Sequence, residues 1–249
     1  MLSASRDFTA LSAFAFIALA ASPAAAGPTQ TVPFVGCAGD GMTGPVAAPT
    51  GGPKAVAVDA ATASRLAYYQ SPDNLAALAP RGWRCFYFYG SSGAVLVIAA
   101  SEDPSTLVGK PLTGNGVVLR NDDGGTSGRF AVAEYAARLF PQLEKKFIAD
   151  VIAEGIEPKS SFPSGPYPAD KLTYKTPRLV EFVTPANKDG LGDAGAPRGD
   201  SGALQKNASP ISGMAKLVDS EQGLQFYLLT VRLPPEQANL APAIVSQAE

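Results

Sequence analysis

The sequence predicts an α+β fold: a single domain with an antiparallel sheet, a helical pair in the middle and a short C-terminal helix. Two apolar runs flank a Gly-Ser-Ser-Gly turn, which is typical of a β-hairpin. Later in the chain, apolar residues recur three and four positions apart, which is the spacing of helices. The chain lacks the regular strand–helix–strand alternation of a parallel sheet.

Residues 1–26 have the three-part layout of a secretory signal peptide. Arg6 gives a basic start, Leu11–Ala21 is almost wholly apolar, and Ala24–Ala26 is a small-residue run that signal peptidase accepts. The apolar run is short against the roughly 20 residues that a membrane-spanning helix needs. We therefore expect cleavage after Ala26, no membrane span in the mature chain, and a soluble exported protein in the periplasm or outside the cell.

The mature chain, residues 27–249, is long enough for one domain with a substantial core. It begins with a Gly/Pro-rich segment, residues 27–54, which we expect to be extended and loop-rich. Without Arg6 and Asp7 it has 19 basic and 21 acidic residues, from totals of 20 and 22, so its formal charge is −2. A chain with this charge is not expected to bind nucleic acid.

The first half of the mature chain predicts one short helix and three strands. Asp59 is placed as the N-cap of a helix over residues 60–70. Residues 85–89 and 95–98 predict the two strands of the hairpin, and residues 117–119 predict a further short strand.

The second half begins with the helical stretch, residues 129–155. Pro141 lies inside this stretch, so it predicts two consecutive helices or one kinked helix, closed by Gly155. Strands are expected at 179–183, 213–218 and 224–232, with a long polar loop over 184–209. Pro234 and Pro235 then introduce the short C-terminal helix.

Cys37 and Cys85 are the only cysteines of the chain. In an oxidising compartment a single pair most simply forms one disulfide. The alternative is a reactive thiol, but there is no Cys-x-x-Cys motif and no histidine to lower a thiol pKa. We expect a structural disulfide that closes a loop of about 49 residues and stabilises the fold by about 4 kcal/mol.

Gly199-Asp200-Ser201-Gly202 has the tetrapeptide sequence that surrounds the nucleophile of trypsin-like serine proteases. Such a serine needs an imidazole base, and the chain contains no histidine. It also contains neither a Ser-x-x-Lys nor a Gly-x-Ser-x-Gly motif. A distant lysine could still approach Ser201, but the residue types favour a surface turn.

Other chemistries have weak signals. Asn187, Asp189, Asp193 and Asp200 cluster in the polar loop, yet their spacing departs from a calcium-binding loop, so we expect a solvated acidic loop and no metal. Without histidine, transition metals lose a usual ligand, and the absence of a Walker A motif leads us to expect no cofactor.

Carboxylates for glycosidase-type catalysis are present, for instance Glu154, Asp170 and Glu181. The sequence does not bring any two of them together.

The aromatic run at residues 86–89 allows two interpretations. It is either a core strand packed against the disulfide or a platform for a ligand. Arg81 and Trp83, which lie next to Cys85 in the chain, are our candidate binding residues.

Several segments resemble a family of exported bacterial proteins with no established activity. The resemblance is carried by VGCAGDGMTGP (35–45), APRGWRCFYFYGSSG (79–93), TSGRF (126–130) and VIAEGIEPKSSFPSGPYPADKL (151–172), and by the RLVEFVTPANKDGLGD and TVRLPP stretches. It implies a bacterial exported protein with one Cys37–Cys85 pair and carries over no catalytic residue. It also implies that residues 199–202 fall in a variable loop.

We therefore expect a non-catalytic protein that binds an envelope or extracellular partner. The alternative is a histidine-free hydrolase that uses paired carboxylates or a Ser-Lys pair at Ser201.

Overall fold

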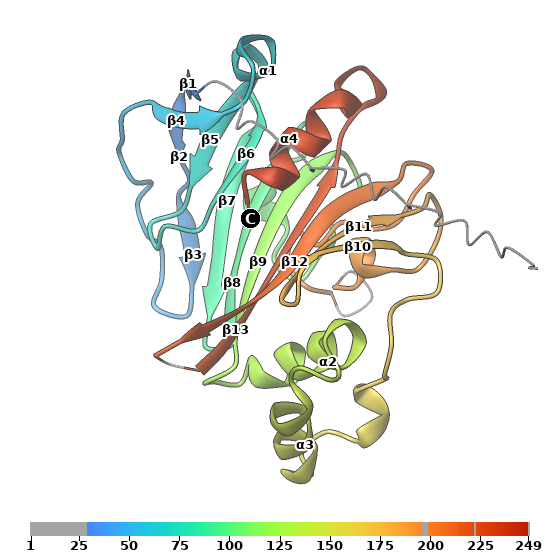
Figure 1. Cartoon of the computed structure of the whole chain (residues 1–249). Coiled ribbons are helices and arrows are strands. Elements are labelled where there is room, and N and C mark those ends of the chain that lie inside the picture. Colours follow the sequence, from blue (N-terminus) through green and yellow to red (C-terminus); the bar gives the residue numbers. More distant parts are fainter. Residues whose placement is uncertain (1–28, 196–198, 222, 249) are drawn as a thin grey trace, which may run out of the picture.

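The computed structural model describes residues 29–195, 199–221 and 223–248 (Figure 1). The expected signal peptide, residues 1–26, lies outside them. In the described part of the chain, no helix has both the length and the apolar character that crossing a membrane requires.

The α+β fold class is confirmed, and it is built on three sheets. The largest has eight strands in the order β10-β11-β12-β13-β9-β8-β7-β3, and two smaller sheets have the orders β2-β5-β6 and β1-β4. The strands are β1 (Thr29–Val32), β2 (Phe34–Gly36), β3 (Gly39–Gly41), β4 (Lys54–Ala57), β5 (Leu66–Gln70), β6 (Ala76–Pro80), β7 (Arg84–Gly90), β8 (Gly93–Ala99), β9 (Gly116–Asp123), β10 (Lys171–Thr176), β11 (Leu179–Thr184), β12 (Ile211–Ser220) and β13 (Gly223–Arg232).

The large sheet is antiparallel, as expected, except at one edge. There β3 pairs in parallel with β7, and in the three-stranded sheet β2 pairs in parallel with β5. Both parallel pairs involve the N-terminal segment, which forms short strands instead of the loops that its glycines and prolines predict. These pairings depend on tertiary contacts, because a three-residue strand has no periodicity that a sequence can display.

One face of the large sheet packs on the small sheets and the C-terminal helices. Alternation along β8 directs Leu96 and Ile98 to this face, where they join a core with Leu66 and Tyr69 of β5. A 3-10 helix (Pro235–Leu240) and α4 (Ala241–Ser246) close the same core with Ile244. The short C-terminal helix that follows Pro234 and Pro235 is therefore confirmed.

The opposite face carries the helical pair. α2 (Arg129–Leu139) and α3 (Lys145–Ala153) pack on β11, β12 and β13, and α2 stacks Tyr135 on Phe226 with 4.4 Å between ring centroids. α2 ends at Leu139, with Phe140 as its C-cap directly before Pro141, so the expected break is present. Gly155 adopts a left-handed φ of 66° just after α3, as a closing glycine should.

The same face is also covered by the polar loop between β11 and β12. We call it the cover loop; its described parts are residues 185–195 and 199–210. Leu204 of this loop packs with Val97, Val118 and Leu112, the last from the β8–β9 connection. An isolated parallel bridge joins Leu112 to Leu204.

The expected helix over residues 60–70 is wrong in its second half. Asp59 caps the helix as expected, since its carboxylate accepts from the Thr62 backbone N–H at 2.9 Å. However, α1 ends at Arg65 (Ala60–Arg65), and residues 66–70 form β5 between β2 and β6. Pairing on both sides and burial of Tyr69 outweigh the weak helical spacing of this short stretch.

Candidate functional site

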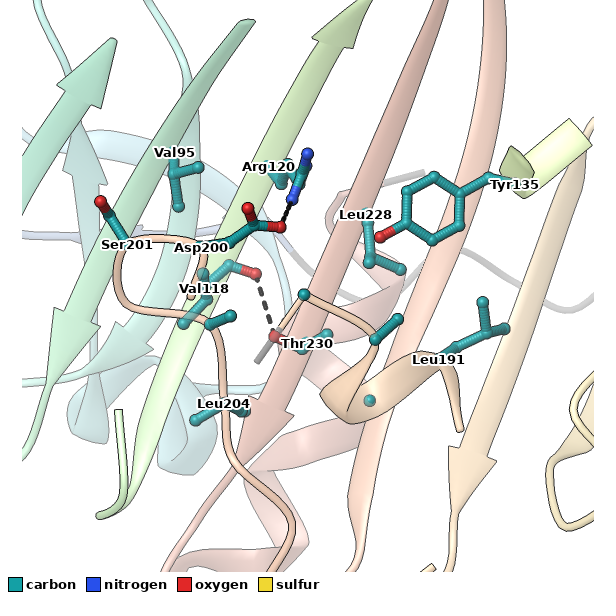
Figure 2. A pocket seen from close by; sticks show the side chains of 14 residues that line it. Val95, Val118, Arg120, Tyr135, Leu191, Asp200, Ser201, Leu204, Leu228 and Thr230 are labelled. Atoms are coloured by element: carbon teal, nitrogen blue, oxygen red, sulfur yellow. Dashed lines mark hydrogen bonds and ion pairs between the residues drawn. The ribbon is translucent and has the colours of Figure 1, made fainter. Parts of the chain in front are cut away.

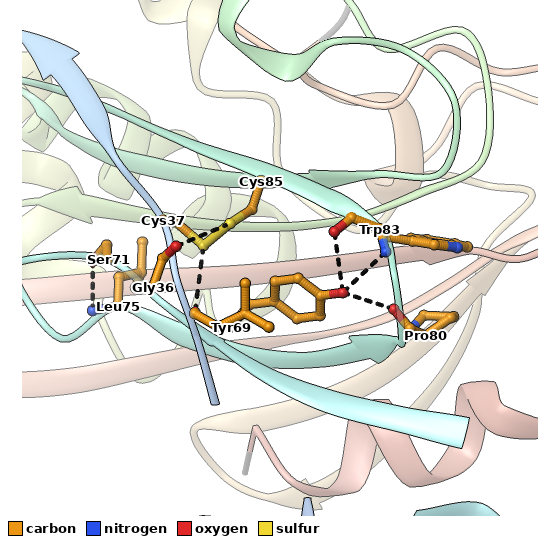
Figure 3. The surroundings of a disulfide bond; sticks show 9 residues. Gly36, Cys37, Tyr69, Ser71, Leu75, Pro80, Trp83 and Cys85 are labelled. Carbon is orange, nitrogen blue, oxygen red and sulfur yellow. Dashed lines mark hydrogen bonds between the residues drawn. A yellow bond between two sulfur atoms is a disulfide. The ribbon is translucent and has the colours of Figure 1, made fainter. Parts of the chain in front are cut away.

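The expected disulfide is confirmed. The Cys37 and Cys85 sulfur atoms are bonded at 2.05 Å, with 5.4 Å between the Cα atoms, and no described cysteine is free (Figure 3). The bond joins the segment between β2 and β3 to the start of β7. It therefore helps to position the aromatic strand relative to the N-terminal segment.

Arg81 and Trp83, our candidate binding residues, lie in the short connection between β6 and β7. The Arg81 guanidinium donates to the carbonyl oxygens of Ala63 and Leu66, both at 2.9 Å, and so binds the end of α1. The Trp83 backbone N–H donates to the Tyr69 hydroxyl at 3.1 Å (Figure 3). These contacts give both residues a structural role, and their role in binding stays a prediction.

The Gly-Asp-Ser-Gly turn lies against the central strands. Gly199 and Gly202 have left-handed φ angles of 71° and 69°, which favour glycine. A Cβ on Gly202 would lie 2.2 Å from a methyl carbon of Val97, and the Gly202 N–H donates to the Lys110 carbonyl at 2.8 Å. Both glycines are thus explained by backbone conformation and close packing.

Asp200, in the same turn, forms an ion pair with Arg120 of β9. Figure 2 shows this pair, and the Arg120 guanidinium also contacts Asp122 at 2.6 Å. The Arg120 and Asp122 side chains are 18% and 3% exposed. Burial acts to lower the pKa of Arg120, but Asp122, Tyr135 and Asp200 together hold that pKa above its ordinary value. A permanently charged guanidinium therefore ties the turn to the sheet.

Ser201 itself accepts a hydrogen bond at Oγ from the Gly109 backbone N–H, at 3.0 Å. This bond ties the turn to the connection between β8 and β9. The neighbouring carboxylate of Asp200 is engaged with Arg120, so it is poorly suited to act as a base. The contacts of Ser201 are those of a turn that is docked on its neighbours.

Two adjoining depressions, of about 340 and 200 Å³, open beside Ser201 at the end of β7. Phe88, Tyr89 and Ser201 line both of them. Asp40 of β3 and the exposed Val108 line the larger one. We call this surface the Ser201 groove. The aromatic strand and the Gly-Asp-Ser-Gly turn, about 110 residues apart in sequence, thus meet at one site.

A small cavity adjoins the Ser201 groove and shares Arg120, Asp200 and Ser201 with it. Figure 2 shows the residues that line this cavity. Its volume of about 20 Å³ has room for one water molecule. The buried Tyr135 side chain and Thr230 also line it, and burial raises the pKa of Tyr135. This cavity is too small for an organic ligand.

The aromatic run divides between the two faces of the sheet. Phe86 and Phe88 contact each other at 5.0 Å between ring centroids on the side of the cover loop, and Tyr87 and Tyr89 stack at 5.5 Å on the other side. Phe88 is only 9% exposed. The run is thus largely core, and its end forms part of the groove.

Residues 39–44 read Gly-Asp-Gly-Met-Thr-Gly, the G-x-G-x-x-G spacing of dinucleotide-binding loops, which sequence reasoning missed. In those loops a strand precedes the glycines and a helix follows. Here Gly39 and Gly41 belong to the edge strand β3, where a Cβ would lie 2.5 and 2.1 Å from the carbonyl oxygens of Tyr87 and Tyr89. The two glycines are required for close strand packing.

The carboxylates that could serve a glycosidase have separate structural partners. Glu154 binds Arg129 at 2.6 Å and Glu181 binds Lys175 at 3.1 Å. Asp170 accepts from the Thr184 hydroxyl at 2.7 Å, and burial raises its pKa. The three carboxylates therefore bind three different partners.

The expected solvated acidic loop requires a correction at Asp193. This side chain is 4% exposed, and its carboxylate accepts a hydrogen bond from the Gly190 N–H at 2.9 Å. The bond stabilises the local 3-10 turn (Leu191–Asp193). Asp189 instead pairs with Lys206 at the surface. Within the described residues, no group of three histidine, cysteine or acidic side chains is arranged to hold a metal ion.

Comparison of the chain with protein-family models, with curated proteins and with solved structures found no match.

Proposed function

We propose that this chain is an exported bacterial binding protein that holds its ligand in the Ser201 groove without catalysing a reaction on it. Export is supported by the signal-peptide layout of residues 1–26 and by the Cys37–Cys85 disulfide, which persists in oxidising compartments. The resemblance to exported bacterial proteins points in the same direction. Such a protein works in the periplasm or outside the cell.

One observation carries the proposal of a binding site. The end of the aromatic strand and the docked turn line the same open groove, which offers an aromatic ring, a hydroxyl and carboxylates within one surface. A concave surface with apolar walls and a few polar groups is typical of ligand sites. The contacts of Ser201 and Asp200 favour binding over catalysis.

A fragment screen by NMR tests the proposal on the ¹⁵N-labelled mature chain, residues 27–249. We expect the fragments that bind to shift the amide signals of Phe88, Tyr89 and Ser201. Val108→Trp should block the groove, since Val108 is 67% exposed at its wall, and should abolish these shifts. The matched control is Ile156→Trp, at a site that is 65% exposed after α3. Hits that cluster elsewhere, or that survive Val108→Trp, would contradict the proposal.

Labelling with a fluorophosphonate probe distinguishes the hydrolase alternative. We expect no labelling of the wild-type chain, because the Ser201 hydroxyl contacts a backbone N–H and, within the described residues, no activating base. Labelling that disappears in Ser201→Ala would establish a nucleophilic serine and replace the binding function with an enzymatic one.

A further inference from the structure

We propose that the outer edge of β10 binds an extended acidic segment of a partner protein, which adds to the large sheet as a ninth strand. This surface is separate from the Ser201 groove and does not depend on the function proposed for that groove. β10 stands at the end of the eight-stranded order and, within the described residues, pairs with β11 alone. Its other edge can therefore accept a strand.

The side chains of β10 are unusually accessible for a strand. Five of its six residues are exposed, and Tyr174 is 51% exposed. A depression of about 580 Å³ runs beside the strand on the face that carries α4, with Lys171, Thr173 and Lys175 along one wall. Pro242 of α4 and the exposed Val183 of β11 line other parts of it. An added strand could place alternate side chains in this depression.

The charge of the strand selects an acidic partner. β10 reads Lys-Leu-Thr-Tyr-Lys-Thr, with two lysines and no acidic residue, and both lysines line the same depression. Glu181 neutralises part of this charge through its 3.1 Å contact with Lys175. Lys171, Lys175 and Glu181 together carry a net charge of +1. Opposite charges on neighbouring strands stabilise their pairing, so this charge favours an acidic strand.

The same lysines disfavour a second copy of this chain as the occupant. An antiparallel pair of β10 strands centred on Thr173 would set Lys171 of each copy opposite Lys175 of the other. Like charges directly opposite one another destabilise a strand pair. Edge lysines of this kind prevent self-association while leaving the edge open to a strand of opposite charge.

The test uses synthetic peptides and the ¹⁵N-labelled mature chain. The probe is acetyl-Thr-Glu-Val-Thr-Val-Glu-Thr-amide, whose two glutamates are spaced to face Lys171 and Lys175. The neutral control peptide has glutamine in place of both glutamates. We expect the acidic peptide to bind on the order of ten-fold more tightly, to shift the amide signals of β10, and to lose this advantage at high salt.

A charge-reversed protein sharpens the test. The double variant Lys171→Glu with Lys175→Glu should no longer bind the acidic peptide. It should instead bind a peptide that has lysine in place of both glutamates. The double variant Lys145→Glu with Lys159→Glu changes the net charge equally away from β10 and should bind like the wild type. If the reversed protein does not fold, N-methylation of alternate peptide amides provides a test on the wild type, because it removes strand hydrogen bonds and should abolish binding.

Equal binding of the acidic and neutral peptides, shifts that map away from β10, or no binding at all would overturn the proposal. Concentration-dependent dimerisation of the wild type through β10 would also overturn it and would make a second copy the occupant. These measurements do not involve the Ser201 groove. A negative result for β10 therefore says nothing about ligand binding in the groove, which the fragment screen tests separately.

Discussion

Arg232, at the end of β13, is completely buried, and its replacement offers a sharp test of what holds the cover loop. The side chain is 1% exposed, and its guanidinium donates to backbone carbonyl oxygens of two separate segments. These are Gly114 at 3.0 Å and Thr113 at 2.8 Å in the β8–β9 connection, and Gln205 in the cover loop. Arg232→Met retains much of the volume and removes all of these bonds.

The expected loss of stability depends on which hydrogen bonds these carbonyl oxygens still accept once Arg232 is replaced. Thr113 still accepts from the Asn207 amide at 3.1 Å. Gly114 and Gln205 have Arg232 as the sole recorded donor to their carbonyls in the described residues. Leaving a fully buried carbonyl unpaired costs about 1–3 kcal/mol, and the lower end of this range applies here because the bonds to Gly114 and Gln205 are only partly buried. The loss of the bonds to both carbonyls is offset in part because a charge is no longer buried, and it lowers the free energy of unfolding by about 2 kcal/mol.

Urea unfolding of the non-reduced mature chain measures this change, with fluorescence of Trp83, the single tryptophan, as the signal. For a domain of this size the melting temperature should fall by about 4–8 °C. Hydrogen exchange should also accelerate at the Gly202 and Leu112 amides, which bond across the two segments.

Arg65→Met is the control, since Arg65 makes exposed hydrogen bonds to Asn239 and Glu236 and should cost no more than about 1 kcal/mol. A loss below about 1 kcal/mol for Arg232→Met would refute the reasoning.

Three further predictions concern the disulfide, a helix cap and two carboxylates, of which Asp170 is half-buried and Asp193 is buried. Replacing both Cys37 and Cys85 with alanine should lower the free energy of unfolding by about 4 kcal/mol in urea, whereas an unchanged midpoint would show that the bond adds no stability. Asp59→Ala should lower the urea midpoint through loss of its bond to the Thr62 N–H, and Asp59→Asn should recover most of this loss. Burial raises the pKa of Asp170 and Asp193 above 3.8, so both carboxyls bind protons more readily in the folded chain and favour folding as the pH falls through these raised values. Carbon-detected NMR titration checks this, and midpoints at or below 3.8 would contradict it.

Local signals in the sequence were sufficient for several elements. The turn between β7 and β8 was predictable because Gly90 and Gly93 bracket two small polar residues between apolar runs. The division between α2 and α3 was predictable because Pro141 cannot continue a helix. The Cys37–Cys85 bond followed from a single pair of cysteines in a chain that is expected to be exported.

Other elements had no local signal. β10 was missed because an exposed edge strand needs no apolar face, so its residues show no alternation of apolar and polar types. Residues 66–70 were expected to be helical because their spacing is ambiguous over such a short stretch, and only pairing with β2 and β6 makes them a strand.

The residues themselves determined that a histidine-free Gly-Asp-Ser-Gly turn lacks the base of a serine protease, because that base is a residue type and the chain does not contain it. Only the tertiary structure brought this turn to the aromatic strand. The ion pair between Asp200 and Arg120 and the bond from Gly109 to Ser201 join segments about 80–90 residues apart. No local spacing in the sequence encodes such a contact. It depends on which strands are neighbours in the sheet, and on the need of a buried charged side chain for a partner.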